Sequence, residues 1–198
     1  MSQDQTPVEI VAIIDRSGSM AEIQSDAIGG FNAFLEKQKQ LPGEATLTLT
    51  LFDHEYLTPV TAAPLQTVEP LTDQTFVPRG TTALYDAIGR TLTDLLARSP
   101  QRAIVVILTD GIENASREFS RDQVKDLITR AQDKGYQVLY LAANQDAFQS
   151  GGQIGVVRSA TMNFNYTGAG IRSAMNAVTM STARYRSGGT GEIEPEDE

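Results

Sequence analysis

Short, nearly unbroken apolar runs alternate along the chain with segments in which apolar residues recur every three to four positions. The continuous runs are typical of central strands in a parallel sheet that is covered on both faces. They cover residues 8–14, 103–108 and 136–142. In residues 45–52 threonine alternates with leucine, which predicts one more polar face and a place nearer a sheet edge. Residues 56–60 are expected to pair with that strand, and residues 159–164 to form a last one.

Helices are predicted between these strands. Apolar stripes at helical spacing run over residues 23–35, 84–95, 124–131 and 171–185. The first of these helices should stop before Pro42, and the third should begin with a capping box formed by Ser120 and Gln123. A further helix is expected to begin at Asn144. Strands that alternate with helices predict an α/β fold with a doubly wound sheet.

Composition narrows the class of protein. The 198 residues suit one domain, with 40% hydrophobic and 21% charged residues. We expect an N-terminal extension over residues 1–7, a domain over 8–186 and a flexible acidic tail over 187–198. The chain has no cysteine and one histidine, which excludes a disulfide framework and leaves little room for a zinc site of nitrogen and sulfur ligands.

The charge and hydropathy of the chain limit the possible partners and predict the cellular location. A net charge of −9 argues against binding to nucleic acid. The apolar stretches are strand-sized, and residues 1–7 have neither the basic start nor the apolar run of a signal peptide. We therefore expect a soluble, cytoplasmic protein that does not bind membranes.

Hydroxyl and carboxyl side chains gather where two central strands are predicted to end. The first strand runs into Asp15-Arg16-Ser17-Gly18-Ser19, the second into Thr109-Asp110-Gly111, and Arg79-Gly80-Thr81-Thr82 precedes a helix. Doubly wound sheets bind ligands at this edge. Oxygen ligands without imidazole or thiol select a hard cation such as Mg²⁺, Mn²⁺ or Ca²⁺. With few charged ligands, such an ion would seek one more anionic oxygen, and a partner's carboxylate could supply it.

These three segments resemble the metal-ion-dependent adhesion site of von Willebrand factor A (vWA) domains. The resemblance covers residues 8–185, and the chain is more similar to vWA proteins of the intracellular bacterial or phage type than to extracellular adhesins. It implies a Rossmann-like sheet of six mostly parallel strands with one antiparallel edge strand and helices on both faces. It also implies Mg²⁺ binding. The implied ligands are the hydroxyls of Ser17, Ser19 and Thr82, with Asp15 and Asp110 acting directly or through water.

One loop departs from the family pattern, which usually reads Gly-Gly-Thr. Here Thr81 takes the place of the second glycine, so Thr81 is a rival to Thr82 as the ligand. Each candidate residue also has a structural alternative. The aspartates could cap strand-to-helix turns, and the hydroxyls could cap turns or helix starts. Their joint occurrence favours a metal site.

The resemblance implies a non-catalytic module in which the metal bridges to an Asp or Glu of a partner protein. In related intracellular systems that partner is often an ATPase or a component of a stress or assembly complex. Two alternatives stay open: a metal-dependent hydrolase with Asp110 as base, and a metal-free scaffold. Arg16 and Arg79 are expected either to be solvated or to contact an anionic partner. Glu113 and Asn114 are expected to cap the segment that follows Asp110.

Overall fold

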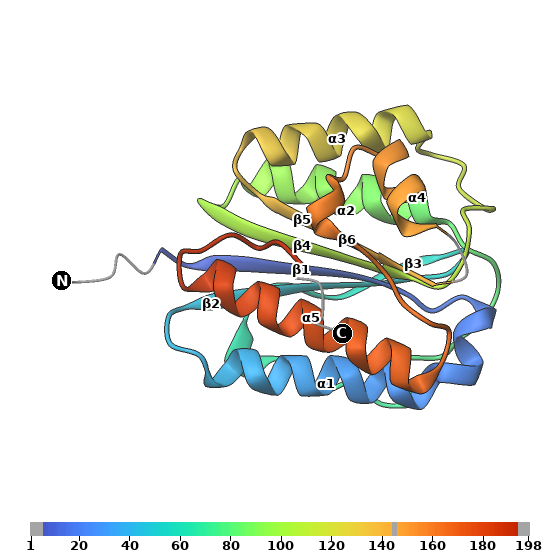
Figure 1. The fold of residues 1–198 in the computed structure, drawn as a ribbon, viewed down its shortest axis with the longest axis horizontal. Helices are drawn as coiled ribbons and strands as arrows, with labels where there is room; N and C mark the ends of the chain where they lie inside the picture. Colours follow the sequence, from blue (N-terminus) through green and yellow to red (C-terminus); the bar gives the residue numbers. More distant parts are fainter. Residues whose placement is uncertain (1–5, 144–145, 194–198) are drawn as a thin grey trace.

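A twisted sheet of six strands forms the centre of the protein, and helices cover both of its faces (Figure 1). The computed structural model describes residues 6–143 and 146–193. The strand order is β3-β2-β1-β4-β5-β6, with β3 antiparallel to β2 and every other pair parallel. The strands are β1 (Val8–Asp15), β2 (Ala45–Phe52), β3 (Tyr56–Pro64), β4 (Arg102–Thr109), β5 (Gln137–Ala142) and β6 (Thr161–Asn163). The predicted doubly wound sheet with one antiparallel edge strand is confirmed.

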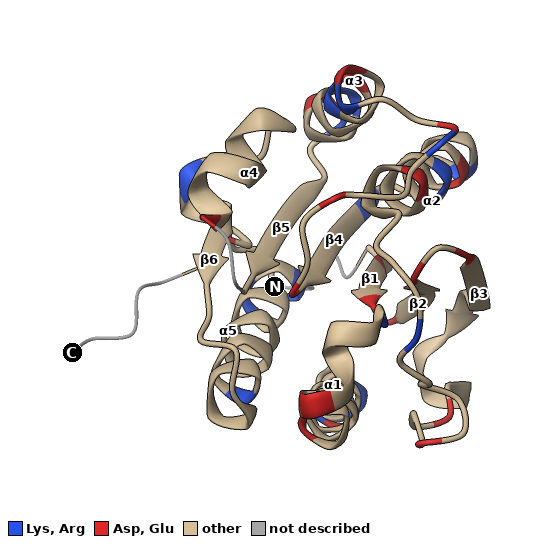
Figure 2. Ribbon diagram, turned by 90° about the vertical axis from the view of Figure 1, so that its right-hand side faces the viewer, with Lys and Arg blue, Asp and Glu red and all other residues tan. Residues whose placement is uncertain are grey.

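The first strand lies in the middle of the sheet. All eight residues of β1 are buried, and β1 pairs with β2 on one side and β4 on the other. The chain therefore winds outward first to β3 and then returns to the other half. The strand order reverses between β1 and β4, and this reversal opens the crevice where such sheets bind ligands. Figure 2 looks onto this edge, at which the parallel strands end.

Two layers of helices enclose the sheet. They are α1 (Gln24–Gln40), α2 (Leu84–Arg98), α3 (Arg121–Asp133), α4 (Ala147–Gln153) and α5 (Gly168–Arg186). Helices α1 and α5 pack side by side on one face, whereas α2, α3 and α4 cover the other (Figure 1). The four helices predicted from apolar stripes are present, and the capping box at Ser120 and Gln123 is confirmed. None of the helices in the described part of the chain is long and apolar enough to cross a membrane.

Several boundaries differ from the sequence prediction. Strand β6 has three residues because the short 3₁₀ helix Arg158–Ala160 replaces its predicted start. A second 3₁₀ helix, Gly18–Ile23, precedes α1. Asn144, predicted to start a helix, lies outside the described residues. Helix α4 begins at Ala147, and Asp146 caps it by accepting hydrogen bonds from two backbone N–H groups.

The polar face of β2 is buried rather than exposed. The strand lies second from the edge, as predicted, but α2 covers its threonines. Thr50 Oγ1 lies 3.1 Å from Thr91 Oγ1, and Thr48 Oγ1 donates to Glu9 at 2.8 Å. Arg98 from α2 forms an ion pair with the same glutamate. These contacts satisfy polar groups that would otherwise be costly to bury.

The edge strand β3 is irregular and longer than predicted. Its pairing with β2 shifts register twice, and Ala62 adopts a positive φ of 43°. The backbone N–H of Ala62 donates to Thr48 Oγ1 at 2.9 Å. A buried side chain of β2 thus fixes the irregular part of β3.

The chain beyond α5 turns back and packs against the body of the domain. Ser181 Oγ donates to the carbonyl of Gly191, and the backbone N–H of Ile193 donates to the carbonyl of Ser159 at 2.9 Å. A Cβ on Gly191 would lie 2.6 Å from the side chain of Gln137. This packing differs from the flexible tail expected from residue 187 on. The acidic residues 194–198 lie outside the described residues.

Candidate metal centre

Three loops meet at the edge where β1 and β4 end. Asp15 is the last residue of β1, Asp110 follows β4, and Thr82 precedes α2. Backbone hydrogen bonds connect the loops: Gly18 N donates to Gly80 O at 3.1 Å, and Asn114 N donates to Thr82 O at 3.0 Å. Segments far apart in sequence are therefore held together without help from a ligand.

Two serine hydroxyls and one carboxylate lie close together in this site, and of these three residues only Ser19 is exposed. Ser17 Oγ lies 3.1 Å from Ser19 Oγ, which donates to Asp110 Oδ1 at 2.9 Å. Ser17 Oγ lies 3.5 Å from the same carboxylate oxygen. Neighbouring oxygens in an octahedron around Mg²⁺ are roughly 3.0 Å apart, given metal–oxygen distances of about 2.1 Å. The donor set and two of its three oxygen–oxygen distances therefore fit a small hard cation, and the third distance, at 3.5 Å, would have to shorten.

Asp15 anchors the floor of the site. Its Oδ1 accepts a hydrogen bond from the backbone N–H of Ser17, and its Oδ2 accepts one from Thr109 Oγ1, both at 2.6 Å. The first bond shapes the turn that presents the serines. Each carboxylate oxygen keeps a second lone pair for a metal or a bridging water.

Burial governs the charge of the two aspartates. It raises the pKa of Asp15 from 3.8 to about 6, because an ionised carboxylate is poorly solvated in this position; the nearby Asp110 contributes in the same direction. Burial also raises the pKa of Asp110. In the described part of the chain, no three His, Cys, Asp or Glu side chains gather as a metal-binding group. A cation here would therefore rely on hydroxyls together with this pair of acids.

The two candidate threonines have different surroundings. Thr82 is buried, and its backbone N–H donates to Asn114 Oδ1 at 2.9 Å. A Cβ at Gly111 would lie 2.8 Å from Thr82 Oγ1, so only glycine lets this hydroxyl lie beside the Asp110 loop. Thr81 is exposed and lines a separate groove with His54. The geometry favours Thr82 over Thr81.

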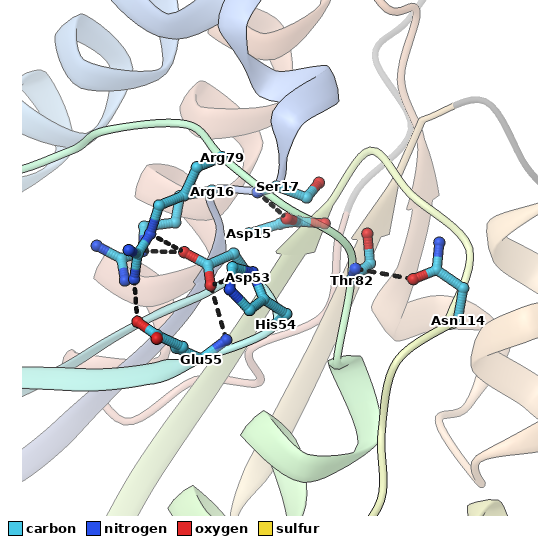
Figure 3. A network of polar contacts seen from close by, with 9 residues as sticks. All are labelled: Asp15, Arg16, Ser17, Asp53, His54, Glu55, Arg79, Thr82 and Asn114. Atoms are coloured by element: carbon cyan, nitrogen blue, oxygen red, sulfur yellow. Dashed lines mark hydrogen bonds and ion pairs between the residues drawn. The ribbon is translucent and has the colours of Figure 1, made fainter.

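A buried ion cluster that the sequence analysis missed lies next to the serine loop (Figure 3). Asp53, which directly follows β2, is fully buried. Its Oδ2 lies 3.0 Å from Arg16 Nε and 3.0 Å from Arg79 Nε, and Arg79 also pairs with Glu55. Arg16 is buried, so the expectation that its side chain is solvated is wrong. The side chain of Arg79 is 45% exposed. The cluster connects the serine loop to the threonine loop.

Acidic side chains behind the site fix the loop that follows Asp110. Glu113 accepts hydrogen bonds from the backbone N–H groups of Ala115 and Ser116, and Asn114 binds Thr82. Glu113 therefore caps the segment that follows Asp110, as predicted, whereas Asn114 instead binds the loop before α2. Asp86, in the first turn of α2, accepts from three consecutive backbone N–H groups of the same loop, a role that the sequence did not indicate.

The sequence itself matches one protein family over most of its length. The model of the family described as "VWA domain containing CoxE-like protein" matches residues 2–166. The chain belongs to this family. A search of curated proteins found no match.

Solved vWA structures share the fold of this vWA domain at low sequence identity. The vWF domain of the type V pili tip protein Mfa5 from Porphyromonas gingivalis has a TM-score of 0.68 and 12% identity, with 98% of each chain covered. The ArnB paralog VWA2 from Sulfolobus acidocaldarius has a TM-score of 0.62 and 16% identity, with 88% of this chain and 44% of that one covered.

Proximal thread matrix protein 1 from the mussel byssus, solved with a zinc-occupied MIDAS motif, has a TM-score of 0.67 and 12% identity. The match covers 89% of this chain and 46% of the mussel protein, so this chain corresponds to about half of that protein's length. These likenesses establish the fold.

Proposed function

We propose that this vWA domain is a non-catalytic, metal-dependent protein-binding module. The observation that carries the proposal is the spacing of Ser17 Oγ, Ser19 Oγ and Asp110 Oδ1 at the carboxyl edge of the sheet. Ser17 is buried whereas Ser19 is exposed. A cation held there would thus face solvent on one side, where a partner can reach it.

The proposed ligand set follows the family motif. The hydroxyls of Ser17, Ser19 and Thr82 would bind Mg²⁺, and Asp15 and Asp110 would bind it directly or through water. When bound, the metal supplies a Lewis-acidic position that takes an anionic oxygen. The protein positions the hydroxyls, and an Asp or Glu of a partner protein would complete the coordination shell. Binding of Mn²⁺ and Ca²⁺ should be compared with binding of Mg²⁺. Zn²⁺ should be tested as well, because the mussel structure contains zinc.

Thermal unfolding with each cation tests the metal site. A metal that binds only the folded state adds about 2.7 kcal/mol at 100 times its Kd, which raises Tm by about 5–10 °C for a domain of this size. Ser19→Ala removes an exposed hydroxyl without disturbing the core and should reduce the shift, and Asp15→Ala should abolish it. A wild-type protein whose Tm is unaffected by millimolar concentrations of all four cations would contradict the metal site.

Partner binding is tested separately. A partner protein should be cross-linked to the wild type when the reaction contains Mg²⁺. It should not be cross-linked when the reaction contains EDTA, or when Asp15→Ala replaces the wild type. A partner that stays bound under both conditions would overturn the bridging mechanism. We further propose that the partner is an ATPase or a component of a stress or assembly complex, which identification of the cross-linked protein would test. We also propose that the protein is cytoplasmic, which cell fractionation would test.

The absence of catalysis is part of the proposal and has its own test. We expect no turnover of p-nitrophenyl phosphate or of casein with Mg²⁺ or Mn²⁺. Metal-dependent turnover by the wild type that disappears in Asp110→Asn would place the reaction at this site, and would replace the binding module with a hydrolase.

A further inference from the structure

The turn that follows β2 contacts both loops that carry candidate hydroxyl ligands. The backbone N–H of Arg16, in the serine loop, donates to the carbonyl of Phe52 at 2.7 Å. The backbone N–H of Ala83, at the end of the threonine loop, donates to the carbonyl of Asp53 at 2.8 Å. The two loops therefore rest on one turn, and a side chain in that turn can fix both of them at once.

The carboxylate of Asp53 binds a side chain from each loop. Arg16 stands directly before the candidate ligand Ser17, and Arg79 stands three residues before Thr82. Both arginine Nε atoms lie 3.0 Å from Asp53 Oδ2. Figure 3 shows the two guanidinium groups reaching back to this carboxylate, away from the hydroxyl of Ser17. A shift of either arginine would therefore move backbone that presents a candidate ligand.

Charge rather than hydrogen bonding joins Arg16 to Asp53. Within the described residues the buried Nε of Arg16 has no hydrogen-bond partner, although it lies 3.0 Å from the carboxylate, whereas Arg79 Nε donates to the same oxygen. Asp53 and Glu55 together balance the two arginines, so the ion cluster formed by these four residues carries no net charge. An amide at position 53 would keep the shape of the carboxylate and leave Arg16 without an attractive partner.

We propose that Asp53 is a positioning residue of the metal centre. It lies outside the proposed ligand set and acts through Arg16 and Arg79, which it holds so that the serine hydroxyls and Thr82 are in place before a cation binds. This inference rests on the proposed function and adds to it the group that holds the ligand loops together. Removal of groups that orient metal ligands typically weakens metal binding about 10–100-fold, because the released ligands must be ordered again when the metal binds.

Calorimetric titration of Mg²⁺ into two variants separates position from charge. Asp53→Asn leaves the ion cluster with one surplus positive charge and leaves the buried Arg16 unpaired. The double variant Asp53→Asn/Arg16→Met keeps the cluster neutral and has no unpaired buried charge, so it also serves if the single variant does not fold. Both variants should bind Mg²⁺ about 10–100-fold more weakly than the wild type.

Amide hydrogen exchange in EDTA observes the same loops without metal. Two backbone hydrogen bonds join the loops directly: Gly18 N–H donates to the carbonyl of Gly80 at 3.1 Å, and Arg79 N–H donates to the carbonyl of Arg16 at 2.9 Å. If Asp53 holds the loops together, both amides should exchange about tenfold or more faster in the two variants than in the wild type, because the loops open more easily.

Glu9→Gln is the matched control. Glu9 is also buried and pairs with an arginine, Arg98, but it lies near the start of β1, about 20 Å along the strand from Asp15. This substitution should lower stability and leave both the Mg²⁺ affinity and the exchange of the two amides unchanged.

The outcomes distinguish this inference from the proposed function. Recovery of wild-type Mg²⁺ affinity in the double variant, with wild-type exchange at Gly18 and Arg79, would show that only charge mattered. That result would overturn the positioning role and leave the metal site standing. Failure of the wild type to bind any of the four cations would overturn the proposed function itself.

Discussion

The stability of the metal-free protein should depend on the charge of one aspartate. Burial raises the pKa of Asp15 from 3.8 to about 6, whereas in the unfolded chain it returns to its ordinary value. Between these values the folded state binds more protons than the unfolded state. This contribution to stability is therefore complete below about pH 4 and is lost as the pH rises through 6.

The magnitude follows from the size of the shift. About two pKa units correspond to about 3 kcal/mol, since one unit is 1.36 kcal/mol. For a domain of this length that amounts to about 6–12 °C in Tm. Asp15→Asn removes the titration while its amide can still accept from Ser17 N–H and donate to Thr109 Oγ1. In metal-free buffer, Asp15→Asn should therefore lose less stability than the wild type between pH 4 and pH 7.5.

Urea unfolding of both proteins in EDTA, at half-unit pH steps, measures the difference. Asp122→Asn is the matched control, because this aspartate on α3 has a side chain that is 83% exposed; it should follow the wild-type curve. At pH 7.5 added Mg²⁺ should stabilise the wild type and not Asp15→Asn. Parallel wild-type and Asp15→Asn curves in EDTA would refute the claim that burial penalises the ionised carboxylate.

Three further predictions test individual contacts. Thr82→Ala should lower Mg²⁺ affinity about tenfold or more in calorimetry while Thr81→Ala does not; the reverse result would make the exposed threonine the ligand. Asp53→Ala leaves buried arginine charge without its partner and should cost about 3–5 kcal/mol in urea unfolding; a loss below 1 kcal/mol would show that the ion cluster is unimportant. Tyr166 donates through its hydroxyl to the carbonyl of Ser19. Tyr166→Phe should weaken Mg²⁺ binding more than it lowers Tm, and unchanged affinity would refute this positioning role.

Much of the fold was predictable because burial leaves a direct trace in the sequence. A strand covered on both faces must be apolar at nearly every position, as in residues 103–108, and such runs gave the central strands. The threonine face of β2 misled in one respect. Thr50 is hidden by Thr91, which lies 41 positions along the chain, and no local pattern reports so distant a hydrogen bond.

The candidate site shows the same division. The residues of the motif could be proposed from sequence, because parallel strands bring their ends to one edge and oxygen side chains follow two of them. Asp53 also follows a strand, and this position was the one feature of the sequence that could have marked it as a site residue. Its role could not be inferred, because its partners Arg16 and Arg79 come from two other loops. The return of residues 187–193 to the domain was likewise hidden, since a Gly-rich composition is typical of linkers.

The irregular edge strand has a consequence for solubility. Sheets with long, regular free edges recruit other strands and aggregate. Here β3 carries Pro59 and Pro64, which lack N–H donors, and the hydrogen bond from Ala62 to Thr48 holds its distortion in place. The opposite edge, β6, is only three residues long. Both margins of the sheet are therefore poor templates for the addition of a strand from another molecule.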